Sequence, residues 1–321
     1  LSQPLRGILF VGAVSMLFHI LSLPVSIYTQ FVIEEKHGFN KMTPKTFVVD
    51  QLKGMLLSVA LGVPVLLGLF WFVRSAGQLW WIYAFAALAV FQLVLSVIYP
   101  VLIAPLFNKF TPLDEGSLKI KIEDLAQTLS FGTRGIFVMD GSRRSGHSNA
   151  YFTGFGRMKR IVLFDTLLSQ LDEEQILAVL AHEIGHQKKK HILQRLGVSL
   201  AMTAAAFWLI SILLESKALF TAFGFEQMST HGLLVILSFC SGPFTFMLTP
   251  LFTMWSRHHE YQADRFAAES IGRSAEMKTA LLTLGRDNLS NLTPHPLYSF
   301  FHYSHPTLAE RIGFLSELEK S

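Results

Sequence analysis

Long apolar stretches dominate the pattern of hydrophobic and polar positions along this chain. Five of them reach the roughly 20 residues that a helix needs to cross a bilayer: residues 7–29, 54–73, 79–104, 196–214 and 232–254. Trp80, Trp81 and Tyr83 lie at the start of the third stretch, as is typical of the membrane–water interface. The pattern predicts a mostly α-helical, polytopic membrane protein with two polar parts.

This pattern divides the chain into four parts. Residues 1–104 are expected to form three N-terminal transmembrane helices, and residues 196–254 a transmembrane hairpin. Residues 105–195 are the larger extramembrane region, and residues 255–321 are a C-terminal extramembrane region. Two spans separate these regions, so the chain crosses the bilayer an even number of times between them and both lie on the same side.

The region 105–195 mixes helical and strand patterns. Residues 118–129 are amphipathic at helical spacing, while residues 135–139, 149–152 and 160–164 read as three short strands, the last two separated by a glycine-rich turn at 154–156. An edge strand of such a sheet can pair with an extended peptide. It can equally be an ordinary edge strand, and the sequence leaves both interpretations open.

A helix is predicted over residues 173–191, with Asp172 as its N-cap and Gln175 completing a capping box. This helix carries the motif H-E-x-x-H. His182 and His186 are four residues apart on one face, so the two side chains can hold one metal ion together. Glu183 is then placed to act as a general base on a metal-bound water. The motif alone also occurs in helices that bind nothing.

A third metal ligand is expected after the fifth span. Zinc bound by two histidines and a glutamate, with one open position for water, is a standard catalytic arrangement. Residues 260–269 are expected to continue as a helix. Asp264 lies four residues after Glu260 on the same face, placed to accept a hydrogen bond from a ligand histidine. His258 and His259 are rival ligands, and the spacing does not choose among the three.

Composition and charge agree with a membrane protein. The chain is 51% hydrophobic and 16% charged, whereas a soluble domain carries about 25% charged residues. Its net charge of +4 suggests an anionic lipid surface, and we expect no nucleic-acid partner. Lysines gather on the side of the polar regions, which predicts that this side is cytoplasmic. The single cysteine, Cys240, excludes an internal disulfide.

Five sequence segments together resemble a known family. They are EEKHGFN at 34–40, SNAYF at 148–152, HEIGH at 182–186, SRHHEYQAD at 256–264 and YSHPTLAER at 303–311. Their identity and order are similar to those of the M48 metallopeptidases, specifically the integral-membrane type I CAAX prenyl proteases. The segments extend over nearly the whole chain, so the resemblance is far more specific than H-E-x-x-H alone.

The resemblance implies a fold and a set of site residues. The family fold is a helical barrel around a large chamber, with a small zincin-like α+β catalytic region that contains a short β-sheet. By resemblance, one Zn²⁺ per chain is bound by His182, His186 and Glu260, and Glu183 is the catalytic base. The remaining assignments are Asp264, which orients a ligand histidine; Asn149 and Ala150, on the strand that binds substrate backbone; His305, near the oxyanion; and Arg311, with a structural role.

The resemblance also implies an activity. The enzyme would cleave the C-terminal tripeptide from prenylated CAAX proteins, with a peptide or protein substrate and the lipid bilayer as its partners. Family members generally have seven spans, so we expect two further spans before Leu1. The membrane would be the endoplasmic reticulum in a eukaryote or the inner membrane in a bacterium.

Two alternative functions stay open at this point. In a bacterium the same machinery would serve quality control of membrane proteins, without prenyl specificity. A non-enzymatic channel or scaffold with a structural metal is the alternative from another class. Glu183 argues against the second, because a structural metal site needs the histidines but has no use for that glutamate.

Overall fold

The computed structural model describes residues 2–154, 159–272 and 274–320, so part of the predicted turn at 154–156 lies outside the described residues. The chain divides into two compact units. The first contains residues 1–37, 42–96 and 195–245, and the second contains residues 38–41, 97–194 and 246–321.

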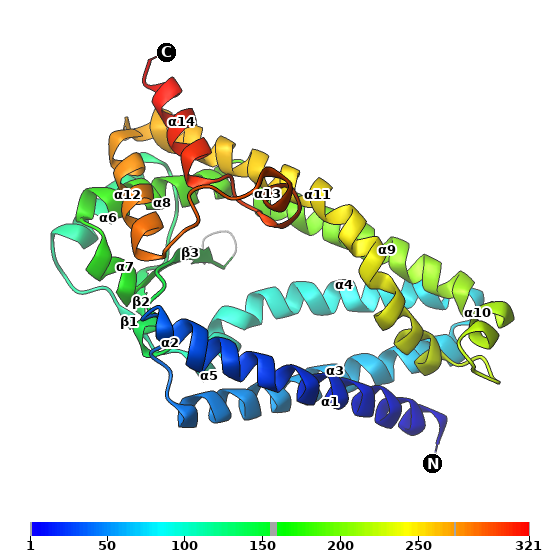
Figure 1. The fold of residues 1–321 in the computed structure, drawn as a ribbon. Coiled ribbons are helices and arrows are strands. Elements are labelled where there is room, and N and C mark those ends of the chain that lie inside the picture. The colour runs from blue at the N-terminus through cyan, green and yellow to red at the C-terminus, as the bar shows by residue number, and fades with distance from the viewer. Residues whose placement is uncertain (1, 155–158, 273, 321) are drawn as a thin grey trace. The chain divides into compact units, whose positions relative to one another are not determined.

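The first unit consists of long apolar helices (Figure 1). These are α1 (Gln3–Tyr28), α3 (Pro44–Ser75), α4 (Trp80–Ile98), most of α9 (His191–Leu213), the short α10 (Lys217–Ala222) and the first part of α11 (Thr230–Ile271). A short helix, α2 (Glu34–Lys36), follows α1. Thr43 caps α3 by accepting a hydrogen bond from the backbone N–H of Thr46, and Pro44 at the first turn lacks the N–H that would otherwise be left unpaired.

Five helical segments of the described chain are long and apolar enough to cross a membrane: Gln3–Lys36, Pro44–Ser75, Gly77–Phe107, His191–Leu213 and Thr230–Ser270. Many of their large apolar side chains are exposed, for example Leu56 at 71%, Phe244 at 73% and Met247 at 73%. Such exposure is costly in water but expected in lipid. All five predicted spans are therefore present.

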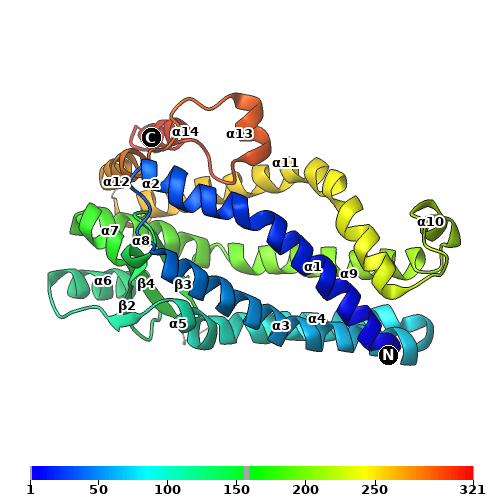
Figure 2. The ribbon, with the colours of Figure 1, turned by 60° about the horizontal axis from the view of Figure 1, so that its bottom comes forward.

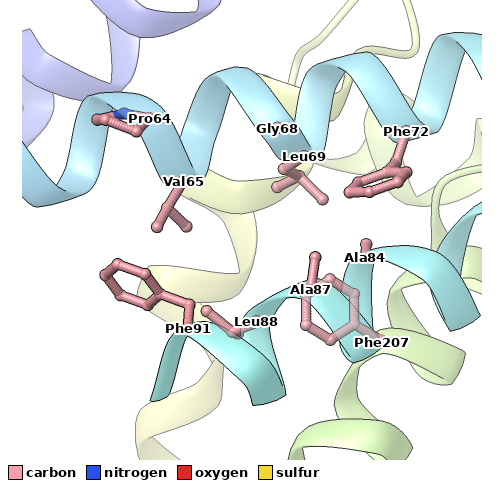
Figure 3. Close-up of a pocket in the computed structure, with 10 residues that line it drawn as sticks. All are labelled: Pro64, Val65, Gly68, Leu69, Phe72, Ala84, Ala87, Leu88, Phe91 and Phe207. Carbon is pink, nitrogen blue, oxygen red and sulfur yellow. The ribbon is translucent and has the colours of Figure 1, made fainter. Parts of the chain in front are cut away.

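An apolar cavity of about 220 Å³ lies among α3, α4 and α9 within the first unit. Figure 3 shows Val65, Leu69 and Phe72 of α3 facing Leu88 and Phe91 of α4 across it. All ten residues that line the cavity are apolar, so it suits a hydrocarbon chain and offers no polar side chain to a water molecule.

The second unit contains a four-stranded sheet in the order β1-β2-β4-β3. The strands are β1 (Phe110–Pro112), β2 (Ile136–Met139), β3 (Ala150–Thr153) and β4 (Arg160–Phe164). β2 and β4 are parallel, while β1 pairs with β2 and β3 pairs with β4 in antiparallel fashion. Ile161 and Leu163 of the central β4 are fully buried, as a strand with neighbours on both sides should be. Among the described strands, β3 is an edge.

Helices pack around this sheet and make the main core. Figures 1 and 2 show α6 (Ser117–Thr128), α7 (Asp165–Gln170), α8 (Glu173–Lys188) and α12 (Ser274–Asp287) grouped about it. The unit also contains α5 (Ala104–Phe107), α13 (Pro296–His302), α14 (Leu308–Leu318), the start of α9 and the end of α11. Ile176, Leu180 and Ile184 of α8 lie in one buried apolar cluster with residues of α6 and β4, which fixes α8 against the sheet.

The predicted architecture, mostly helical with five spans and a small sheet, is confirmed. Two local differences stand out. The strand β1 was not predicted, and the helix predicted over 173–191 ends at Lys188, with Lys190 at φ 59° before α9 begins at His191. The predicted capping box at Asp172 and Gln175 is present.

Candidate metal centre and active site

Three side chains from two helices converge in the second unit. His182 and His186 come from α8, and Glu260 comes from α11. The Nε2 atoms of the two histidines are 3.2 Å apart, Glu260 Oε2 is 3.3 Å from His182 Nε2, and Glu260 Oε1 is 3.4 Å from His186 Nε2. His182 and Glu260 are buried, and His186 is partly buried.

These separations fit a tetrahedral metal ion. With metal–ligand bonds of about 2.0–2.1 Å at tetrahedral angles, ligand atoms lie roughly 3.3–3.4 Å apart. The chemistry of the three side chains also fits a metal ion. Two imidazole nitrogens that face each other in such a site repel unless a proton or a cation lies between them. Two imidazoles and one carboxylate suit zinc and leave a fourth position open.

Close packing of the two helices brings the three groups together. A Cβ atom on Gly185 would lie 3.2 Å from Ala263 Cα and 3.1 Å from the ring of Phe266, so the backbones approach where both helices carry small residues. Ala263 itself is fully buried. The glycine inside H-E-I-G-H therefore allows α11 to come near enough for Glu260 to face both histidines.

His182 is held by a buried ion-pair network. Its Nδ1 lies 2.7 Å from Asp264 Oδ1, and Asp264 is fully buried. Arg311 of α14 donates to both oxygens of Asp264, from Nε at 2.9 Å and from an Nη atom at 2.6 Å. Burial by itself lowers the pKa of His182. Its hydrogen bonds to Asp264 and Glu260 together outweigh burial and raise the pKa to about 9.

His186 has a different outer partner. Its Nδ1 is 2.9 Å from Nδ1 of His191, the first residue of α9. His191 is 1% exposed, and its Nε2 lies 2.8 Å from Gln262 Oε1. The sequence predicted neither of these partnerships. Arg311 was given only a structural role by resemblance, and His191 was given no role.

The two rival ligands lie away from the three-residue cluster. His258 is exposed, and its Nε2 is 2.9 Å from Gln262 Nε2. The Nε2 atom of His259 is 3.0 Å from Gln194 Oε1, and its ring stacks on His191 with centroids 3.9 Å apart. Of the three candidates that the spacing leaves open, Glu260 is the one whose carboxylate faces His182 and His186.

Two further residues flank the cluster. Glu183 is half-buried, and burial raises the pKa of its carboxyl, which makes the carboxylate a stronger base. His305 follows α13 and has its Nε2 3.5 Å from Glu260 Oε1, while 65% of its side chain is exposed. An exposed imidazole beside the cluster is accessible to a bound peptide.

The edge strand β3 packs against α8. Phe164 N donates to Asn149 O, and the register pairs Ala150 with Leu163, so the N–H and C=O of Ala150 point away from β4. The side-chain Oδ1 of Asn149 accepts from Ala150 N at 2.8 Å. Ala150 therefore lies on the strand edge that faces away from the rest of the sheet.

A helical H-E-x-x-H sequence, a carboxylate from a second helix, a sheet edge and apolar helices are the features of a membrane-embedded metallopeptidase. Residues 112–319 match the family model described as peptidase family M48, and residues 1–109 match the one described as CAAX prenyl protease N-terminal, five membrane helices. The chain belongs to peptidase family M48 and is a metalloendopeptidase.

Individual relatives agree with this assignment. The CAAX prenyl protease 1 homolog of Oryza sativa is 42% identical over 99% of this chain and 75% of its own length. CAAX prenyl protease 1 of Saccharomyces cerevisiae is 41% identical over 98% of this chain and 74% of its own length. The crystal structure of S. mikatae Ste24p superposes with a TM-score of 0.90 at 40% identity, over 98% of this chain and 77% of that one.

The family resemblance inferred from the five segments is thus confirmed, as are the enzyme class and the membrane character. Neither the quality-control protease nor the non-enzymatic channel or scaffold is favoured by these relatives.

Proposed function

We propose that this chain is a zinc-dependent endopeptidase that removes the C-terminal tripeptide from prenylated CAAX proteins. The observation that carries the chemistry is the triangle of His182, His186 and Glu260, whose donor atoms are 3.2–3.4 Å apart. The substrate class is supported by the relatives' names, which describe CAAX prenyl proteases. The five apolar helices support it too, since a prenyl chain need not leave lipid to reach a membrane enzyme.

Each site residue has one task in this proposal. One Zn²⁺ per chain, held by the three ligands, would polarise the scissile carbonyl and lower the pKa of water from about 15.7 towards 7. Glu183 accepts a proton from the attacking water and then passes it to the leaving amine. Asp264, with Arg311, holds His182 in the orientation that keeps its Nε2 towards Glu260.

Two other groups act on the substrate. His305 stabilises the charge that develops on the carbonyl oxygen. Removing a donor of this kind from other enzymes raises the activation free energy by about 3–4 kcal/mol. The outward N–H and C=O of Ala150 pair with an extended substrate backbone. Because Asn149 Oδ1 accepts from that N–H before substrate arrives, the Asn149 side chain must move aside when a peptide carbonyl replaces it.

The proposal places the catalytic region on the cytoplasmic side of the membrane. Depending on the host, this membrane is the endoplasmic reticulum or a bacterial inner membrane. The support is the excess of basic residues in the polar regions between and after the spans.

The test uses the whole chain in detergent. A farnesylated C-terminal CAAX peptide, its unfarnesylated twin and the Glu183→Gln variant are compared, with zinc content measured on the same samples. We expect wild type to release the tripeptide from the farnesylated peptide only, and Glu183→Gln to bind zinc with activity reduced at least a hundredfold. Equal cleavage of both peptides would contradict the proposed recognition of the prenyl group. Full activity in Glu183→Gln would contradict the proposed role of Glu183 as the general base.

A further inference from the structure

The two ligand histidines are oriented by chemically different partners. His182 faces a carboxylate, Asp264, which accepts hydrogen bonds whatever its surroundings. His186 faces another imidazole, that of His191, at 2.9 Å between the two Nδ1 atoms. An imidazole nitrogen is an acceptor in only one of its two neutral tautomers. The tautomer of His191 therefore decides whether His186 can present a lone pair to a metal.

Gln262 fixes that tautomer. Its Oε1 lies 2.8 Å from His191 Nε2, and an amide oxygen only accepts, so His191 must carry its proton on Nε2. His191 Nδ1 is then the acceptor, His186 Nδ1–H is the donor, and His186 Nε2 is left with its lone pair directed at the ligand cluster. The reverse tautomer would protonate His186 Nε2 and abolish its ability to bind a metal.

An exposed residue, His258, orients the amide of Gln262. Its Nε2 donates to His258 Nε2 at 2.9 Å, which keeps Oε1 turned towards His191. The result is one continuous chain of donors, from His186 through His191 and Gln262 to the exposed His258, in which every step runs in the same direction. His259 stacks on His191 with rings 3.9 Å apart and 5° from parallel, and so fixes the plane of the His191 ring.

The break between α8 and α9 makes this chain possible. On an uninterrupted helix, residues five apart point about 140° away from each other, so His191 could not reach His186. Instead α8 ends at Lys188, Lys190 adopts φ 59°, and His191 starts a new helix. A positive φ is uncommon for lysine and costs on the order of 1 kcal/mol or more. This backbone strain occurs at the turn that brings His191 next to His186.

We propose that His191 is a positioning residue for the metal centre, and that the His191–Gln262–His258 relay holds His186 in its metal-binding tautomer. The proposal rests on the proposed zinc-peptidase function, because it concerns the same ligands. Loss of such an outer hydrogen bond generally costs 10–100-fold in metal affinity or activity. The relay should therefore set how long zinc stays bound, and the effect should weaken from His191 outwards.

The primary readout is the rate at which zinc passes from the purified protein to a chelator, which needs no substrate. His191→Phe keeps the ring and its stacking on His259 but removes the acceptor, and we expect zinc to leave 10–100-fold faster. His191→Asn places an amide oxygen close to the original Nδ1 and should restore most of the wild-type residence time. Gln262→Met should show a severalfold effect, and His258→Ala at the exposed end should stay within about twofold.

Two further measurements keep the result interpretable. The melting temperature of each metal-free variant shows whether the fold survives, and the visible spectrum of the Co²⁺-substituted protein reports the geometry of the ligands. Wild-type zinc release in His191→Phe would overturn the proposal. Equal damage in His191→Asn and His191→Phe would overturn it too, because packing would then explain the loss. If wild type retains zinc but cleaves no prenylated peptide, the proposed function fails while the relay is still tested. If wild type binds no zinc, both fail.

Discussion

At the residue scale, the centre depends on charges that are buried and paired. Asp264 is fully buried, and Arg311 supplies it with two hydrogen bonds at 2.6 and 2.9 Å. A third contact, 3.9 Å long, joins Arg311 to Glu260. One guanidinium thus contacts two carboxylates and also lies 3.3 Å from Nδ1 of His182, and it joins α14 to α11.

Replacing Arg311 by methionine should destabilise the protein strongly. Removing one partner of a buried pair leaves an uncompensated charge and costs about 3–5 kcal/mol. For a chain of this size, that lowers the melting temperature by roughly 4–7 °C. Arg311→Lys should recover part of the loss, since lysine keeps the charge but not the bidentate geometry. The measurement is thermal unfolding of the metal-free protein in detergent.

Arg286→Met is the matched control for that experiment. Arg286 also pairs with an aspartate, Asp287 at 2.7 Å, but 77% of its side chain is exposed. Exposed pairs contribute about 0–1 kcal/mol, so its melting temperature should stay close to that of wild type. If Arg311→Met melted like this control, the buried network would have no role in holding α14.

The sequence could predict those parts of the site that rest on local spacing. His182, His186 and Glu183 follow from the helical repeat alone. Spacing alone left Glu260 as one of three candidates, because its distance from the histidines depends on how α11 crosses α8 at Gly185 and Ala263. The family resemblance was needed to choose it. The resemblance gave Arg311 a structural role, but its contacts with Asp264 and the whole role of His191 lay beyond prediction. They are set by tertiary packing and by the unforeseen turn at Lys190.

At the element scale, a short segment of the second unit supports the edge strand. Residues 38–41 lie beside the loop that leads into β3: Gly146 N donates to Phe39 O at 2.8 Å, and Lys41 N donates to Arg144 O at 3.2 Å. The Phe39 ring stacks on His147 with centroids 4.1 Å apart. The end of the segment EEKHGFN, whose role the sequence does not explain, therefore helps to fix the entry to β3.

Phe39→Ala should therefore weaken substrate binding more than catalysis. Losing the stack frees the loop before Asn149 and Ala150, so the strand edge is less well ordered before a peptide pairs with it. We expect KM to rise severalfold with kcat changed less than twofold, the pattern for lost uniform binding. Steady-state kinetics with the farnesylated peptide measure both constants.

A phenylalanine nearby in the sequence supplies the comparison. Phe31 also contacts an aromatic ring, meeting Phe47 edge-on with ring centroids 5.5 Å apart, but within the first unit. Phe31→Ala should leave KM unchanged. An equal rise in KM for both variants would mean that the kinetic effect reflects general destabilisation and not the order of the β3 entry.

Element prediction succeeded where a pattern was long or strongly capped. The five spans and the helix after Asp172 are such cases, and three of the four strands were also indicated. The strand β1 was missed because it has three residues, ends in Pro112 and exists only through its pairing with β2. Short α7, α13 and the close of α8 likewise depend on contacts that a local pattern does not contain.

At the scale of the whole molecule, the orientation of the protein in the membrane is predicted from the distribution of its charged residues. Spans alternate, so residues 30–53, 105–195 and the tail after Trp255 share one side. That side carries Lys36, Lys41, Lys45 and Lys53 near its span ends, while the other side has only Arg6, Arg74 and Lys217 there. Basic residues near span ends are generally retained in the cytoplasm, so we expect the proposed zinc site to lie on the cytoplasmic side.

Cysteine labelling tests this orientation directly. Because Cys240 is the single cysteine, Cys240→Ser gives a background in which each added cysteine reports alone. Glu115→Cys, at a side chain that is 86% exposed, marks the catalytic side, and Gln78→Cys and Lys217→Cys, also at exposed positions, mark the other. In intact bacterial spheroplasts, an impermeant maleimide should label Gln78→Cys and Lys217→Cys but should reach Glu115→Cys only after permeabilisation. The opposite pattern would put the active site outside, away from the compartment in which CAAX proteins are prenylated, and would separate the peptidase chemistry from its proposed substrate.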